Sequence, residues 1–146
     1  MIYIASDHAG YKLKKYLVRY LEKQLEIPFE DMGPYEYDKA DDFPDYAAPL
    51  AKKVVGNKKN KGILICGSGH GVCIVANKIK GARAIQGYSI KGAEMGRKHN
   101  NANILCLAGL VLTEEHAAAI MKTFLENEFE KDERLVRRDK KISELE

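Results

Sequence analysis

The chain has 146 residues, of which 45% are hydrophobic and 31% are charged, a composition typical of one soluble globular domain. This balance argues against a disordered, collagenous or disulfide-stapled chain, and the net charge of +3 is too small to indicate nucleic-acid binding on its own. No apolar run approaches the roughly 20 residues that cross a bilayer, and the N-terminus lacks the pattern of a signal peptide. We therefore expect a single domain over residues 1–146 in the cytoplasm, with reduced cysteines and no membrane partner.

Short apolar runs alternate with amphipathic stretches along the chain, which predicts strands separated by helices. The expected strands are Ile2–Ala5, the weaker Ile27–Met32, Gly62–Cys66, Ala82–Ile85 and Ile104–Leu107. The expected helices are Gly10–Gln24, Tyr46–Val55 with Asp45 as N-cap, Gly71–Ile79, Ile90–Lys98 and Thr113–Asn127. Pro49 fits poorly in the first turn of a helix that begins at Tyr46, which indicates that this start is displaced. Residues 128–146 form a basic C-terminal tail or helix.

This order predicts an α/β fold with a mostly parallel sheet of about five strands and helices on both faces. In such sheets the ligand site forms at the carboxyl ends of the strands. The rule selects Ser6–His8, Cys66–Gly71 and the residues flanking the strand at 104–107.

A glycine-rich turn, Cys66–Gly71, follows the clearest buried strand and opens a helix. Glycines let the backbone approach a ligand closely, and free N–H groups at a helix N-terminus bind anions, so a phosphate or a developing oxyanion fits this turn. Val72 stands where a dinucleotide-binding fingerprint needs glycine, and the Gly-Lys-Ser/Thr of a P-loop is absent. The alternative is a tight turn without a ligand.

Cys66 lies at the end of that strand and beside a helix N-terminus, a location that favours the thiolate. A thiolate there acts as a nucleophile or a general base, whereas the alternative is an inert buried thiol. Cys73 and Cys106 are expected to be inert cysteines within a helix and a strand. A metal site of Cys66, His70 and Cys73 lacks a second ligand cluster to support it, so we expect no metal.

Two histidines and two arginines are further candidates. His8 follows Asp7 at the end of the first strand, and His99-Asn100 precedes the last strand, so we expect both in loops at strand ends. Arg134 and Arg138 are four residues apart and share one face of a helix, where two guanidiniums suit a phosphate. The alternative for the arginines is a solvated basic tail.

Taken together, these residues resemble the ribose-5-phosphate isomerase B family, which is grouped with the galactose-6-phosphate isomerase subunits. The likeness rests on Asp7-His8, the run ILICGSGHGVCIVANK at 63–78, HNNANIL at 99–105 and the arginine pair, and it extends from Met1 to about Ile142. It implies a Rossmann-like three-layer α/β/α sandwich and a homodimer or tetramer with shared active sites. It also implies interconversion of ribose 5-phosphate and ribulose 5-phosphate in the pentose phosphate pathway, without a metal or cofactor.

The resemblance also implies roles for individual residues. Cys66 matches the proton-abstracting cysteine, and Val72 occupies the position where some relatives carry a glutamate instead. His99, contributed with Asn100 by the partner subunit, matches the ring-opening histidine, and Asp7 is expected to orient a hydroxyl or a neighbouring histidine. The substrate-binding positions match Asp7, His8, Tyr46, Gly67, Ser68, Gly69, His70, Gly71, Asn100, Arg134 and Arg138.

Two departures from the family pattern keep other functions open. Leu110 stands where the family usually carries a phosphate-binding arginine, and His70 stands where a small or aliphatic residue is usual. Either His70 restores phosphate binding or the preferred sugar differs, although His99-Asn100 favours the ribose branch. The alternatives are an isomerase of allose 6-phosphate or galactose 6-phosphate, or a non-catalytic sugar-phosphate-binding homologue. A nicotinamide-dependent oxidoreductase is disfavoured by the missing third glycine.

Overall fold

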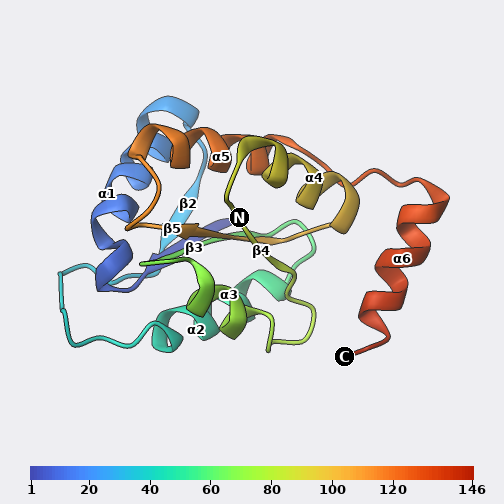
Figure 1. Cartoon of the computed structure of the whole chain (residues 1–146), viewed down its shortest axis with the longest axis horizontal. Helices are drawn as coiled ribbons and strands as arrows, with labels where there is room; N and C mark the ends of the chain where they lie inside the picture. Colours follow the sequence, from blue (N-terminus) through green and yellow to red (C-terminus); the bar gives the residue numbers. More distant parts are fainter.

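A five-stranded, fully parallel sheet runs through the centre of the computed structural model, which describes residues 1–146 (Figure 1). The strand order is β2-β1-β3-β5-β4, and all four neighbouring pairs are parallel. The strands are β1 (Ile2–Ser6), β2 (Phe29–Asp31), β3 (Lys61–Cys66), β4 (Ala84–Gln86) and β5 (Ile104–Ala108). The predicted α/β architecture is therefore confirmed.

Helices cover both faces of the sheet, α1, α4 and α5 on one side and α2 and α3 on the other (Figure 1). The helices are α1 (Tyr11–Tyr20), α2 (Pro44–Val55), α3 (His70–Ala76), α4 (Ile90–Asn100), α5 (Glu114–Glu126) and α6 (Glu133–Ser143). A 3-10 turn at His8–Gly10 precedes α1, and a π-helical turn at Leu21–Leu25 follows it. None of these helices combines the length and apolar content that a membrane crossing requires.

Two helix boundaries differ from the sequence prediction in ways that matter for the site. Helix α2 begins at Pro44 with Phe43 as N-cap, so the predicted Asp45 cap is wrong and Pro49 lies inside the helix. Proline suits the first helical position because its missing N–H has no intrahelical partner there. Helix α4 continues through Asn100, so His99-Asn100 forms a last helical turn and the predicted strand-end loop is wrong.

Alternation along the strands decides which side chains face which helices. Ile63 and Ile65 belong to the core cluster beneath α1 and α5, whereas Leu64 and Cys66 belong to the cluster beneath α2 and α3. Cys106 lies in the second cluster and is fully buried, as predicted, while Cys73 is only half-buried. The side chain of Cys66 therefore emerges on the α2/α3 face.

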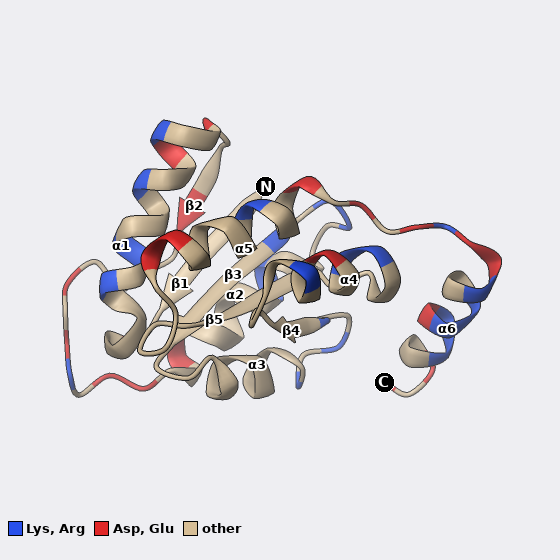
Figure 2. Ribbon diagram, turned by 45° about the horizontal axis from the view of Figure 1, so that its top comes forward, with Lys and Arg blue, Asp and Glu red and all other residues tan.

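Helix α6 projects from the body beside α4 and is rich in charged residues (Figure 2). Arg83, just before β4, donates to the carboxylate of Asp139 and, at 3.0 Å, to its backbone carbonyl. The amide of Gly81 donates to a carboxylate oxygen of Glu146 at 3.0 Å. Leu135 is the buried residue of α6, so polar contacts with the segment before β4 provide much of its attachment.

Candidate active site

The carboxyl ends of β1, β3 and β5 converge at one edge of the sheet. Ser6 pairs with Ile65, and the next amide, that of Asp7, donates to the Ile65 carbonyl at 3.2 Å, which brings Asp7 beside Cys66. On the other side, the Gly109 amide donates to the Cys66 carbonyl at 2.8 Å. The three strand ends thus frame the start of the glycine-rich turn, as expected for a ligand site in a parallel sheet.

The glycine-rich turn wraps its backbone around the sulfur of Cys66. Gly69 has a φ of +76°, a conformation that favours glycine, and a Cβ on it would lie only 3.1 Å from the carbonyl carbon of Leu107. This geometry directs the Gly69 N–H at Cys66 Sγ, at 3.2 Å. The Cys66 residue is 5% exposed, so its thiol lies at the floor of the site.

Several amides of the turn are free to bind an anion. The His70 amide donates to Ser68 Oγ at 3.2 Å, whereas the amides of Gly67, Ser68 and Gly71 have no partner within the chain. Unpaired N–H groups that point in similar directions bind phosphates and oxyanions. The predicted anion-binding turn therefore retains three unpaired donors, while Gly69 serves the sulfur.

Two apolar side chains wall the turn. A Cβ on Gly71 would lie 2.8 Å from the ring of Phe43, and one on Gly67 would lie 3.1 Å from Cδ1 of Leu110. Leu110 is 76% exposed, so it forms an open apolar rim where the resemblance predicted arginine. Phe43 gave no signal in the sequence because it lies in an irregular loop whose approach to the turn is a tertiary contact.

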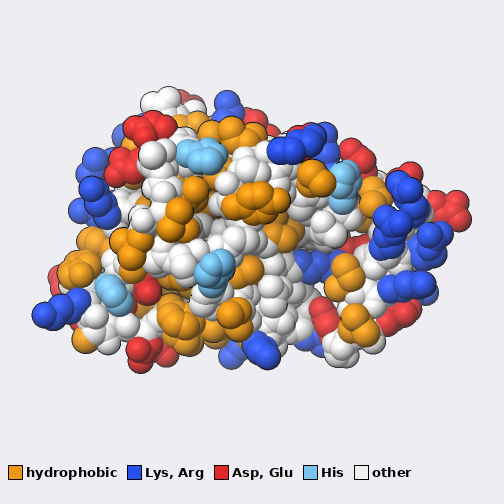
Figure 3. All heavy atoms as spheres, viewed as in Figure 1, with side chains coloured by type: hydrophobic (Ala, Val, Ile, Leu, Met, Phe, Trp, Pro, Cys, Tyr) orange, Lys and Arg blue, Asp and Glu red, His pale blue; other side chains and the backbone are white.

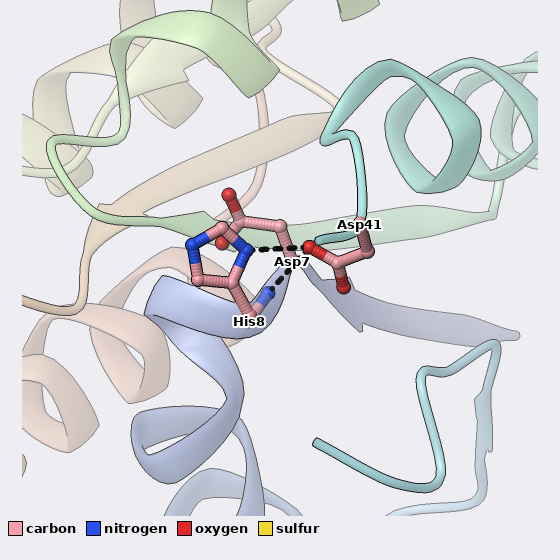
Figure 4. A group of neighbouring side chains, drawn as sticks. All are labelled: Asp7, His8 and Asp41. Atoms are coloured by element: carbon pink, nitrogen blue, oxygen red, sulfur yellow. Dashed lines mark hydrogen bonds and ion pairs between the residues drawn. The ribbon is translucent and has the colours of Figure 1, made fainter. Parts of the chain in front are cut away.

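An acidic cluster holds His8 at the same edge, and Figure 4 shows its three members, Asp7, His8 and Asp41. Asp7 Oδ1 accepts from the Gly10 amide at 3.0 Å and so caps the 3-10 turn. Asp41 Oδ1 accepts from the backbone amide of His8 at 3.0 Å and lies 2.6 Å from its Nδ1. The histidine is therefore oriented by Asp41 and not by Asp7, which the sequence prediction had considered for that role.

The charges of this cluster alter the titration of its members. The hydrogen bond to Asp41 raises the pKa of His8, and the charges of Asp7 and Asp38 act in the same direction against partial desolvation. Burial raises the pKa of Asp7, although the Gly10 amide and the charge of His8 oppose this. Burial, followed by the charge of Asp41, also raises the pKa of Tyr46. The electrostatics therefore favour an imidazolium at His8.

The same cluster is the grouping whose ligand atoms are close enough for a metal ion. The candidate ligand atoms of Asp7, His8 and Asp41 lie within 4.8 Å of one another. However, His8 Nδ1 and Asp41 Oδ1 already share a 2.6 Å hydrogen bond, which a metal ion would have to replace. The set Cys66, His70 and Cys73 considered from the sequence forms no such grouping.

Of the remaining predicted residues, some lie at the same edge of the sheet as Cys66 and others lie far from it. Tyr46 lies in the first turn of α2, close enough to Asp41 for that charge to raise the pKa of its hydroxyl. His70 lines an outward-facing hollow of about 560 Å³ whose other residues are Cys73, Ile74, Asn77, Lys78 and Gln86.

His99 and Asn100 end α4 just before β5 begins at Ile104, so they lie at the amino edge of the sheet, opposite Cys66. Arg134 and Arg138 are exposed on the projecting α6. A single chain therefore brings Asp7 and His8 to the edge of the sheet that holds the glycine-rich turn, and Tyr46 close to Asp41, but it leaves His99, Asn100, Arg134 and Arg138 away from the turn.

Comparison with known proteins assigns this arrangement to a family. The family model described as Ribose/Galactose Isomerase matches residues 2–142. The chain belongs to this family. It is 45% identical over 129 residues to a probable ribose-5-phosphate isomerase B of Mycoplasma pneumoniae, covering 88% of this chain and 84% of that protein. It is 35% identical over 145 residues to ribose-5-phosphate isomerase B of Mycobacterium tuberculosis, and the match covers 99% of this chain and 89% of that protein.

Solved structures of family members have the same fold. Ribose-5-phosphate isomerase B of Mycoplasma genitalium, solved with bound ribulose-5-phosphate, superposes with a TM-score of 0.93 at 43% identity, covering 99% of this chain and 94% of that one. The enzyme of Thermotoga maritima superposes with a TM-score of 0.91 at 41% identity, covering 98% and 97%. Neither comparison leaves a large part of this chain unmatched.

Proposed function

We propose that this chain interconverts ribose 5-phosphate and ribulose 5-phosphate, with Cys66 as the residue that moves the proton between C1 and C2. The observation that carries the proposal is the position of Cys66 Sγ, which receives the Gly69 N–H at 3.2 Å beside unpaired amides. The relative from Mycoplasma genitalium, 43% identical and superposed over 99% of this chain, was solved with ribulose-5-phosphate bound.

The proposed reaction follows from this geometry. The Cys66 thiolate removes the proton from C2 of the open-chain aldose, and negative charge develops on the C1 oxygen. The free amides of Gly67 and Ser68 donate to that oxygen; one preorganised donor of this kind is worth about 3 kcal/mol in the transition state. The thiol then returns its proton to C1, and transfer of the O2 proton to O1 completes the ketose.

We further propose that a second copy of the chain completes each site. His99 lies at the opposite edge of the sheet from Cys66, and Arg134 and Arg138 lie on a helix that extends from the body, so none of them serves the turn of its own chain. Exposed apolar side chains on α3, after β4 and on α4 suit an interface between copies; Ile74 is 62%, Tyr88 71% and Met95 44% exposed. Figure 3 shows hydrophobic side chains on this face.

In the proposed homodimer, the partner subunit's His99 assists ring opening and the arginines bind the phosphate. Two guanidiniums one helical turn apart suit a phosphate dianion, because each donates a pair of hydrogen bonds. The three free cysteines fit a reducing compartment, so we place the enzyme in the cytoplasm.

Another sugar phosphate is the second candidate substrate, because Leu110 removes a cation that the family resemblance predicts at the rim of the site. Rates on ribose 5-phosphate, allose 6-phosphate and galactose 6-phosphate distinguish the two. The proposal requires the highest kcat/KM with ribose 5-phosphate. A protein that binds these sugars without converting them is a non-catalytic homologue.

The test of the chemistry is Cys66→Ala. We expect turnover of ribose 5-phosphate to fall by at least about 100-fold, because loss of a general base costs this much or more, while sugar-phosphate binding is retained. Cys73→Ala is the matched control, since Cys73 is a half-buried thiol on α3 outside the proposed mechanism. A Cys66→Ala protein that keeps more than a tenth of the turnover would show that the base is another residue.

A further inference from the structure

Asp41 is a buried carboxylate outside the proposed proton-transfer mechanism. Its side chain is 6% exposed, and it lies in the loop that leads into α2. Oδ1 contacts both the backbone amide and the ring Nδ1 of His8, whereas Oδ2 is buried without a hydrogen-bond partner. Burying a charged group costs free energy unless the group is hydrogen-bonded and paired with an opposite charge.

The positive charge available to Asp41 is the imidazolium of His8. The charged groups that act on His8 are Asp7 beside it in the chain, and Asp38 and Asp41 in the loop before α2, and all three are acidic. The ring of Tyr37 contacts the imidazole edge-on, with a centroid separation of 6.2 Å. His8 is therefore surrounded by groups that stabilise its charged form and restrict its rotation.

The other ring nitrogen of His8 is free. Nε2 has no hydrogen-bond partner in the chain, the side chain is 31% exposed, and Figure 4 shows this nitrogen directed away from Asp41. His8 lies one residue beyond Asp7, which lies beside Cys66, so its free N–H is at the same edge of the sheet as the reacting thiol. The phosphate of a pentose 5-phosphate lies at the other end of the sugar from C1 and C2, so its donor has to lie at this edge of the sheet without bonding to the thiol. His8 meets this requirement, because its hydrogen bonds are to Asp41 and not to Cys66.

We propose that Asp41 is a positioning residue for the substrate phosphate: it fixes His8 by Nδ1 and the backbone, and thereby presents Nε2–H as a charged donor to a phosphate oxygen. This inference rests on the proposed isomerase function and adds a residue to it. The imidazolium of His8 then supplies the phosphate with a positive charge that Leu110 cannot provide.

The variant that tests the role is Asp41→Asn, which keeps the side-chain shape and an acceptor oxygen but removes the charge. We expect the pH midpoint of His8, followed by NMR of the ring protons, to fall, because the hydrogen bond to Asp41 is the main cause of its raised pKa. We expect KM for ribose 5-phosphate at neutral pH to rise about tenfold, with kcat within twofold, because uniform binding is lost. Glu36→Gln is the matched control, an exposed carboxylate in the same loop.

The pH profile separates positioning from a merely structural role. In the wild type, KM should rise with pH at the midpoint of His8, and in Asp41→Asn this rise should begin at lower pH because the raised pKa is lost. A lower kcat with unchanged KM would overturn the proposal, because Nε2 would then act on a reacting hydroxyl. If Asp41→Asn does not fold, the wild-type protein alone provides the test. A pH midpoint of the change in KM that differs from the pH midpoint of the His8 NMR signals contradicts the proposal.

Binding of inorganic phosphate separates this inference from the proposed function. We expect phosphate to shift the His8 ring signals of the wild type in a saturable way, and to bind Asp41→Asn about tenfold more weakly. Equal affinity for the two proteins would overturn the role of Asp41. If the wild type binds phosphate at His8 but does not convert ribose 5-phosphate, the proposed function fails while the role of Asp41 stands.

Discussion

Leu110 is the residue that most directly tests how the phosphate is held. It is 76% exposed and contacts Gly67, so an arginine side chain fits at this position without disturbing the core. We expect Leu110→Arg to lower KM for ribose 5-phosphate severalfold, because an added guanidinium forms charge-assisted hydrogen bonds to the phosphate. Steady-state kinetics measure this.

The control for this change is Val111→Arg, which adds the same charge at a neighbouring position that is 75% exposed. An unchanged KM in Leu110→Arg would show that the phosphate is already neutralised, and His70 or His8 would be the source of that charge. An equal effect of the two variants would indicate general electrostatic attraction instead of a specific contact.

The sequence predicts the residues of the candidate site where the chemistry is local. Cys66 and the glycines are adjacent in the chain, and their order between a strand and a helix indicates an anion site. Asp41 was not predictable, because it meets His8 across 33 residues of chain and no periodic pattern leads to it. The role of Asp7 as a turn cap likewise depends on the conformation of a short 3-10 turn.

At the scale of elements, all five strands were predicted, and the errors lie at helix boundaries, namely the start of α2 and the end of α4. Asn101 adopts the left-handed conformation at φ +52° and ends α4, whereas the sequence prediction ended this helix at Lys98. Asparagine is one of the residues that adopt the left-handed conformation at the end of a helix, so Asn101 was a helix-end signal in the sequence. The difference decides that His99 lies on a rigid helical turn and not in a mobile loop.

The attachment of α6 gives a prediction at this scale. Asp139→Ala removes the carboxylate that accepts from Arg83 and keeps the backbone acceptor. Hydrogen bonds to charged groups are worth about 1.5–3 kcal/mol, so we expect detachment of α6 to become at least about tenfold more frequent. Limited trypsin digestion measures this, as faster cleavage within 131–141 while the remaining chain stays resistant. Glu144→Ala is the control, since it keeps every trypsin site and removes only a largely exposed ion pair with Lys140 at 4.0 Å. Equal cleavage rates would show that the ion pair between Arg83 and the Asp139 carboxylate does not hold the helix.

For the whole molecule, the separation of His99 from Cys66 has a simple consequence. The parallel strands place the end of α4 at the amino edge and the glycine-rich turn at the carboxyl edge, and no rotation of side chains closes the length of a five-residue strand. The alternating pattern of the sequence predicts this arrangement once α4 is known to precede β5. What the pattern cannot supply is the position of a second chain, because nothing in a local periodicity specifies an interface.

Complementation between two inactive variants tests the proposed shared site. In a mixed dimer of Cys66→Ala and His99→Asn chains, one site has lost both residues, and the other combines an intact Cys66 with an intact His99 of the partner. Random assembly makes half of the dimers mixed, so we expect co-expression to restore about a quarter of wild-type activity. The control is Cys66→Ala co-expressed with the double variant Cys66→Ala/His99→Asn, which forms no intact site in any dimer. If each chain used its own His99, every site in the first mixture would lack one group, and activity would stay at the level of the separate variants.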